Sequence, residues 1–232
     1  MGQTLKKTIW PALGLALAIV VAPNSKADNF DTTLANGVYF GSGNSNSNFT
    51  TDTSSDHLEL GLSVITRYLG PIDPGAGSNT YTVLPGTTSV SGKDGSIWGF
   101  VFSVDTDYDN SPGGPTVGAY TYSLTVKDLT SGVTTGPFNP SAIPDNAHNG
   151  STGFQNAEAI SFGIYGPPSI FDINAPDLYE IDLTATPTSG AASSEVTVFA
   201  NATGVPEPSS VVLLFTLAAG VFVLGRRRFA AT

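Results

Sequence analysis

Alternation of apolar and polar residues is the dominant pattern between residues 28 and 204. A period of two with one apolar face is typical of antiparallel strands that cover a core on one side. The pattern therefore predicts strands at these apolar series: Leu58, Leu60, Leu62 and Val64; Trp98, Phe100, Phe102 and Val104; Tyr120, Tyr122, Leu124 and Val126; Ile160, Phe162 and Ile164; Tyr179, Ile181, Leu183 and Ala185; and Val196, Val198 and Ala200.

Turn-forming residues separate these series. Gly and Pro cluster at 70–75 and 111–115, and residues 137–153 are expected to form a long loop. The stretch 42–55 is rich in Ser, Asn and Thr, which is compatible with an edge strand or a loop. Together these features predict an all-β fold, a single antiparallel β-sandwich of roughly eight to ten strands in a jelly-roll-like arrangement.

Composition and charge narrow the class of protein. The chain has no cysteine, which excludes disulfides, thiol catalysis and Cys-ligated zinc. Residues 28–204 contain three basic and 18 acidic residues, so the formal net charge of this region is −15. A surface this acidic is repelled by phosphate backbones, so we expect no nucleic-acid partner.

The N-terminus has the layout of a secretory signal peptide. Lys6 and Lys7 precede an apolar run at 9–22, and Ser25-Lys26-Ala27 supplies small residues around a cleavage site. The run is shorter than the ~20 residues that a membrane helix needs. We predict a signal peptide over 1–27, cleaved after Ala27, with the Sec translocon and signal peptidase as partners. The alternative is an uncleaved N-terminal anchor.

The C-terminus combines a short motif, an apolar segment and a basic end. The apolar run 211–225 would cover about 22 Å as a helix, which is marginal against a hydrocarbon core of about 30 Å. A basic cluster after a membrane helix marks the cytoplasmic side. The three parts are the motif Pro206, Glu207 and Pro208, a predicted transmembrane helix at 209–225, and the cluster Arg226, Arg227 and Arg228.

This arrangement resembles the PEP-CTERM sorting signal; the match covers residues 205–228, and the predicted sorting signal extends over 205–232. It implies that an exosortase recognises Pro206–Pro208, that Arg226–Arg228 stop translocation, and that the signal is removed during export. Proteins with this signal typically occur in Gram-negative bacteria that make exopolysaccharide. The implied location is the inner membrane with a cytoplasmic C-terminus, then the cell surface or the extracellular space. The alternative is a permanent single-pass anchor. The family of the domain at 28–204 is not identified.

A group of acidic residues offers candidate chemistry. Asp105, Asp107 and Asp109 lie two residues apart where a predicted strand meets a Gly/Pro loop. Carboxylates at this spacing can supply oxygen ligands to Ca²⁺, and weak sites suffice outside the cell. Calcium is therefore the candidate cofactor. The alternative is a solvated strand end without a metal.

Catalytic motifs are missing from the sequence. The two histidines, His57 and His148, belong to no HExxH motif, and no Gly-x-Ser-x-Gly elbow occurs. We therefore predict a protein that is not an enzyme: an exported surface or matrix protein associated with exopolysaccharide. Two alternatives stay open, a calcium-dependent carbohydrate-binding module and a polysaccharide hydrolase that uses paired acids such as Asp105 or Glu180.

Overall fold

The computed structural model describes residues 28–40, 45–90, 93–162 and 170–203. The predicted signal peptide at 1–27 and the predicted sorting signal at 205–232, including 206–208, 209–225 and 226–228, lie outside the described residues. In the described part of the chain, no helix is both long and apolar enough to span a membrane.

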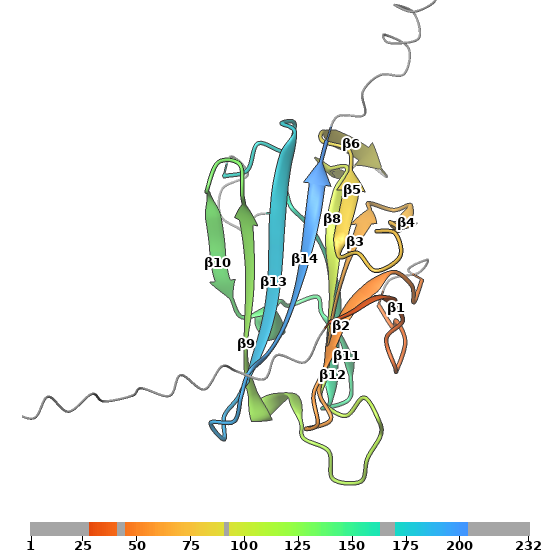
Figure 1. Cartoon of the computed structure of the whole chain (residues 1–232), viewed down its shortest axis with the longest axis vertical. Helices are drawn as coiled ribbons and strands as arrows, with labels where there is room; N and C mark the ends of the chain where they lie inside the picture. Colours follow the sequence, from red (N-terminus) through yellow and green to blue (C-terminus); the bar gives the residue numbers. More distant parts are fainter. Residues whose placement is uncertain (1–27, 41–44, 91–92, 163–169, 204–232) are drawn as a thin grey trace, which may run out of the picture.

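Strands of the described residues form two large sheets and one separate hairpin (Figure 1). The first sheet has the order β1 (Asn29–Thr32), β2 (Phe49–Thr53), β3 (Glu59–Thr66), β8 (Trp98–Asp105), β12 (Gly153–Ala159) and β11 (Ala147–Asn149), with β4 (Gly70–Pro71) paired to β3. The second has the order β10 (Thr134–Phe138), β9 (Tyr120–Asp128), β13 (Asp177–Pro187), β14 (Ser194–Ala202) and β5 (Thr80–Val83). The hairpin pairs β6 (Thr87–Val90) with β7 (Lys93–Ser96).

The predicted all-β, sandwich-like fold is confirmed. The strand pairs are antiparallel except for one, because β5 joins β14 in parallel. Two short 3₁₀ helices, η1 (Val117–Ala119) and η2 (Pro140–Ala142), lie in the connections. The jelly-roll-like arrangement stays a prediction.

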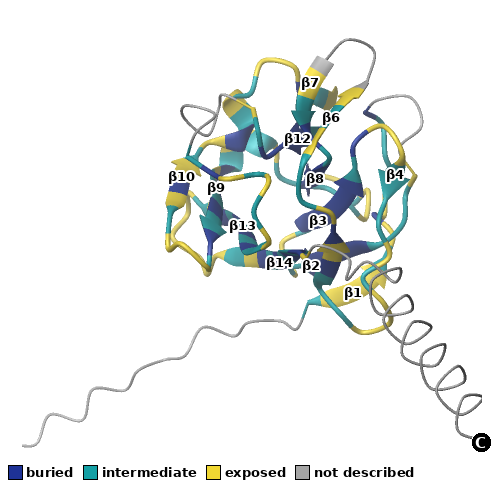
Figure 2. Cartoon of the chain, turned by 90° about the horizontal axis from the view of Figure 1, so that it is seen from above, coloured by how far each residue is buried: buried dark blue, intermediate teal, exposed yellow. Residues whose placement is uncertain are grey.

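Alternate side chains of both sheets fill the space between them. The apolar residues predicted for β3, β8, β13 and β14 are all buried, and Figure 2 shows the buried positions gathered along these strands. Rings from opposite sheets meet in this layer: the centroids of Trp98 and Tyr179 are 5.2 Å apart. Burial of each large apolar side chain contributes roughly 1.5–3 kcal/mol, and without cysteine this layer is the main source of stability.

The outer face of the first sheet is also covered. Leu34 and Phe40, from the segment after β1, pack against Phe49, Ile65 and Val101. Small residues make room for this segment, since a Cβ atom on Gly61 would lie 2.5 Å from Leu34 Cδ2. As a result β3 and β8 are buried on both faces, which alternation alone does not predict.

One predicted strand is misplaced by about one strand length. Sequence alternation placed it at Ile160–Ile164, whereas β12 spans Gly153–Ala159 and the chain turns after it. The reason is that β12 buries polar residues, Gln155 and Glu158 among them, and so lacks an apolar alternation. Phe162 lies past the turn and is exposed, while Ile164 is outside the described residues.

Two predicted loops also contain strands. The expected long loop at 137–153 includes the end of β10, η2 and β11. The polar stretch at 42–55 includes β2, which lies between β1 and β3 and is therefore not an edge strand. Residues 42–44 of this stretch lie outside the described part. Pairing with neighbours on both sides stabilises a strand whose residues are mostly polar.

The central layer makes a testable prediction about stability. Phe102→Ala removes a fully buried ring that packs edge-on against Phe154, with centroids 6.1 Å apart. We expect the free energy of unfolding to fall by about 3–5 kcal/mol, measured by urea denaturation of the full chain. The matched control is Phe30→Ala, which removes an exposed ring and should change stability by less than about 1 kcal/mol. Equal losses in the two variants would contradict this assignment of the core.

Candidate functional site

The predicted calcium ligands lie at the end of β8 and in the turn that follows it. Asp105 is the last residue of β8, and residues 106–109 form the turn. In the strand register, Asp105 lies opposite Glu59 at the start of β3 and opposite Gly153 at the start of β12. Three strands of the first sheet therefore meet the acidic turn at one end of the sandwich.

The three aspartates have separate surroundings. Asp105 is 3 % exposed, and its carboxylate accepts hydrogen bonds from Asn36 Nδ2 at 2.8 Å and from the Asp107 N–H at 3.0 Å. Asp109 is exposed and lies 2.8 Å from Nδ1 of His57. That hydrogen bond is the main reason why the pKa of Asp109 lies below its usual range. Oδ1 of Asp107 is buried and has no hydrogen-bond partner among the described residues.

The three aspartates do not form one cluster. Within the described ranges, no three His, Asp or Glu side chains are grouped so that they could hold a metal ion. Of the set Asp105, Asp107 and Asp109, the structure links the first two through one hydrogen bond and directs the third to His57. Calcium binding at these residues stays a prediction.

Glu59 is a buried acidic residue beside Asp105 that the sequence pattern did not predict as a site residue. Glu59 is 4 % exposed, and its carboxylate accepts hydrogen bonds from the Ala35 N–H at 3.0 and 3.2 Å. Burial raises the pKa of Glu59 to about 7; the Ala35 hydrogen bond opposes this rise, and the charge of Asp105 adds to it. The sequence contained one signal for this burial. Small residues such as Gly61 and Ser103 lie on the same face of the sheet, where they leave room for a covering segment.

A second buried carboxyl lies on the opposite face of the same sheet. Glu158 is the register partner of Phe100 and so points to the interior side of β12. Burial raises its pKa to about 7, and the nearby charge of Asp145 adds to this rise. Because Glu59 faces outward under the covering segment, the two raised carboxyls lie on opposite faces of the sheet.

Asp105 and Glu180, the two acids of the hydrolase alternative, lie on different sheets. Glu180 is on the outer face of the second sheet, where it lies 3.9 Å from Lys127 Nζ. Asp105 lies on the outer face of the first sheet, beneath Asn36. Paired-carboxylate hydrolysis needs two carboxyl groups on either side of one bond, and these two acids do not flank a common space. The second histidine, His148, is exposed on β11.

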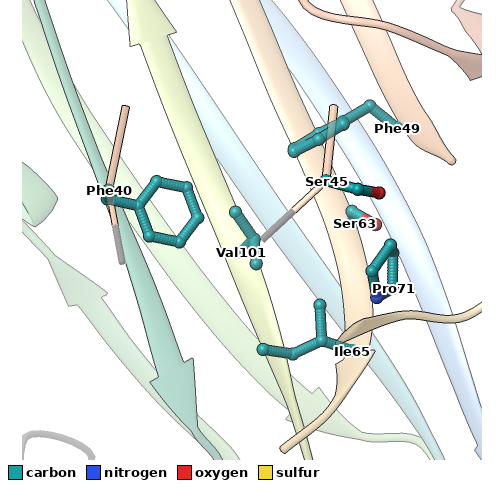
Figure 3. Close-up of a pocket in the computed structure, with 7 residues that line it drawn as sticks. All are labelled: Phe40, Ser45, Phe49, Ser63, Ile65, Pro71 and Val101. Atoms are coloured by element: carbon teal, nitrogen blue, oxygen red, sulfur yellow. The ribbon is translucent and has the colours of Figure 1, made fainter. Parts of the chain in front are cut away.

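A small pocket lies beneath the covering segment on the outer face of the first sheet. Figure 3 shows the seven side chains around it, and none of them is titratable. Both of its hydroxyls are engaged, since Ser63 Oγ donates to the Asn48 carbonyl at 2.9 Å and Ser45 Oγ shares a hydrogen bond of 2.6 Å with Ser47 Oγ. The pocket is thus mostly apolar and supplies no acid or base. Its lining is Phe40, Ser45, Phe49, Ser63, Ile65, Pro71 and Val101.

Comparisons of the chain with models of protein families, with curated proteins and with solved structures found no match. Similarity to a characterised protein therefore supplies neither a ligand nor a reaction for this domain. The basis for a functional assignment is the sequence motifs and the geometry of the described residues.

The raised pKa values predict how stability depends on pH. Glu59 and Glu158 bind protons more tightly in the folded domain than in the unfolded chain, whose glutamates titrate near 4.5. Stability is therefore highest below about pH 4.5 as far as these two groups are concerned, and falls as the pH rises through about 7. One pKa unit corresponds to about 1.4 kcal/mol, so the loss should be on the order of a few kcal/mol.

Glu59→Gln tests this dependence. The amide cannot ionise, so we expect the variant to be more stable than the parent chain at pH 8 and to show a smaller decline between pH 5 and 8. Thermal unfolding across this pH range measures the effect. Asp94→Asn, at an exposed position, is the control and should leave the pH profile unchanged. A Glu59→Gln profile that is parallel to that of the parent chain would rule out the assigned pKa.

Proposed function

We propose that this chain is an exported, non-catalytic surface or extracellular-matrix protein that an exosortase sorts and that associates with exopolysaccharide. The observation that carries the proposal is the order of three C-terminal features: Pro206-Glu207-Pro208, the apolar run 211–225, and Arg226–Arg228. The signal-peptide layout at residues 1–27 supports export, with the Sec translocon and signal peptidase as further partners.

The physical chemistry of the tail suits a transient anchor. The two prolines restrict the backbone to extended conformations, which keeps the motif accessible to an enzyme. The apolar helix keeps the substrate in the membrane until cleavage, and the arginines remain on the cytoplasmic side. The layout parallels other C-terminal anchors in which a hydrophobic tail is exchanged or removed.

The connection between domain and tail is short. The last described strand, β14, ends at Ala202, and the predicted helix begins at residue 209. The six residues between them span at most about 20 Å when extended. Before processing, the sandwich would therefore lie close to the inner membrane, on its non-cytoplasmic side. The sorting motif would lie in the short connection between the sandwich and the membrane.

The properties of the domain support a structural role on the outside of the cell. Its stability comes from an apolar layer that needs no disulfide, and its net charge of −15 keeps it soluble. A β-sandwich can display loops at both ends. In this proposal the domain contributes a stable, hydrated unit to the matrix rather than a reaction.

A calcium-dependent carbohydrate-binding module is the alternative, and one observation favours it. The buried Asp107 Oδ1 has no hydrogen-bond partner among the described residues, and a cation would satisfy it. The hydrolase alternative has less support, because Asp105 and Glu180 lie on the outer faces of different sheets.

The sorting proposal predicts the mass of the mature protein. In a strain with an active exosortase, we expect the C-terminal peptide that includes Arg226–Arg228 to be absent from the mature protein. Glu207→Ala should leave this peptide attached and keep the protein in the membrane fraction, because the motif is damaged while the helix is intact. Mass spectrometry of cell fractions measures both. Glu195→Ala, an exposed change on β14, should be processed normally; retention of the tail in the unaltered chain would refute the proposal.

The effect of Ca²⁺ on thermal stability distinguishes the proposed matrix protein from a calcium-dependent carbohydrate-binding module. If the domain has no calcium site, millimolar Ca²⁺ should leave the melting temperature of the chelator-treated protein unchanged, apart from weak screening of its negative charge that Mg²⁺ reproduces. A site at Asp107 predicts a rise with Ca²⁺ that Mg²⁺ does not reproduce, because a ligand that binds only the folded state stabilises it. Asp107→Asn should abolish that rise, and Asp94→Asn should preserve it.

A further inference from the structure

Arg67 is a buried cation with no acidic partner among the described residues. It follows the end of β3, where its backbone N–H donates to the Ile97 carbonyl at 2.8 Å, and only 7 % of the residue is exposed. Nη2 donates to the Tyr68 hydroxyl at 3.2 Å, while Nη1 has no hydrogen-bond partner among the described residues. The ion pairs found in that part of the chain are His57–Asp109 and Lys127–Glu180, so neither involves Arg67. Buried charges are normally paired because desolvation is costly.

Two exposed aromatic rings flank the guanidinium. Its Cζ atom lies 5.0 Å from the ring centroid of Tyr68 and 5.2 Å from that of Phe162. Such contacts stabilise the cation without neutralising it. Tyr68 is 54 % exposed, Phe162 is 36 % exposed, and the adjacent Leu69 is 84 % exposed. These are three of the five large hydrophobic side chains exposed in the described residues, and contiguous exposed apolar groups mark binding surfaces.

The surrounding backbone holds this arrangement in place. Tyr68 adopts φ +63°, a left-handed conformation that is unfavourable for an aromatic residue, in a turn closed by the Leu69 N–H and the Thr66 carbonyl at 2.9 Å. On the inner side, a Cβ atom on Gly95 would overlap Arg67 Nη1 and approach Ser161 Oγ. Strained residues that persist in a fixed setting are concentrated at ligand sites.

We propose that Arg67, Tyr68 and Phe162 form a binding site for a carboxylated sugar of an exopolysaccharide. We call these three residues the Arg67 cradle. A carboxylate is a stronger acceptor for a guanidinium than a phenol hydroxyl, so it would replace the Tyr68 hydroxyl on Nη2. The exposed rings of Tyr68 and Phe162 offer flat apolar surfaces for the C–H groups of the sugar.

The negative charge of the domain limits how densely charged a bound polysaccharide can be. Residues 28–204 carry a formal net charge of −15, which repels a densely charged polyanion. A single carboxylate between neutral sugars avoids most of this repulsion, since charges beyond about 8–10 Å are screened at physiological salt. The expected ligand is therefore a polysaccharide in which acidic and neutral sugars alternate. The choice of ligand rests on the proposed function, which brings the domain into contact with exopolysaccharide.

Calorimetric titration of the detergent-purified full chain tests the site. The probes are a hyaluronan oligosaccharide, in which glucuronate alternates with a neutral sugar, and the same oligosaccharide with its carboxyl groups reduced to alcohols. In chelator and at about 0.15 M salt, we expect the acidic probe to bind at least about tenfold more tightly than the reduced one. The chelator separates this site from the calcium-dependent alternative.

Variants assign the binding to the cradle. Arg67→Gln should abolish the preference for the acidic probe, and Arg67→Lys should keep part of it, because lysine retains the charge but not the planar guanidinium that packs between the two rings. Phe162→Ala should weaken binding of both probes several-fold by removing the stacking surface. Phe30→Ala, which removes another exposed ring on β1, is the matched control and should bind like the parent chain.

Several results would overturn the proposal. These are equal affinity of the parent chain for the two probes, no binding of either, an intact preference in Arg67→Gln, or tighter binding of a sulfated, carboxyl-free oligosaccharide. If Arg67→Gln does not fold, as judged by its melting curve, Tyr68→Ala and Phe162→Ala decide the question, and unchanged affinity in both refutes the site. Sorting is measured separately by mass spectrometry, so a failure of binding and a failure of the proposed function are distinguishable.

Discussion

The apolar layer between the two sheets is the interaction on which the rest of this structure depends. Alternate residues of β3 and β8 meet those of β13 and β14, and most of these side chains are fully buried. With no cysteine in the chain, covalent cross-links cannot compensate for a weakened layer. Side chains alternate between the two faces along β3 and β8. Packing of the apolar side chains on the inner face therefore places Glu59 and Asp105 on the outer face.

The outward-facing residues of the first sheet gain their properties from a second covering layer. The segment after β1 lies over Gly61, Ser63 and Ser103, where small side chains leave room for it. Glu59 is consequently buried, and its pKa is raised mainly by loss of water, with a further contribution from the charge of Asp105. The carboxyl destabilises the domain when it is ionised, yet the hydrogen bonds from Ala35 tie the covering segment to the sheet.

The two ends of the first sheet hold buried charged groups in different ways. Because β3 and β8 are antiparallel, Glu59 and Asp105 meet at one end, and Thr66 and Trp98 meet at the other, where Arg67 follows. The acidic end satisfies its buried carboxylates with backbone and amide donors. At the other end, the rings of Tyr68 and Phe162 flank the Arg67 guanidinium.

The sequence by itself determined the strand class, the approximate positions of β3, β8, β9, β13 and β14, and most of the residues that these strands contribute to the central layer. It did not identify Tyr81, Val83, Phe154 and Phe171, which belong to the same layer. Alternation is a local property, so it is readable wherever one face is apolar. It failed for β12, whose buried face includes Glu158 and Asn156, and for β2, whose polar residues are covered by neighbouring elements. The burial of Glu59 and the grouping of Arg67, Tyr68 and Phe162 were decided by tertiary structure, because they join residues 24 and 95 positions apart in the chain. Contacts of that kind depend on how strands and covering segments pack, and no local pattern encodes them.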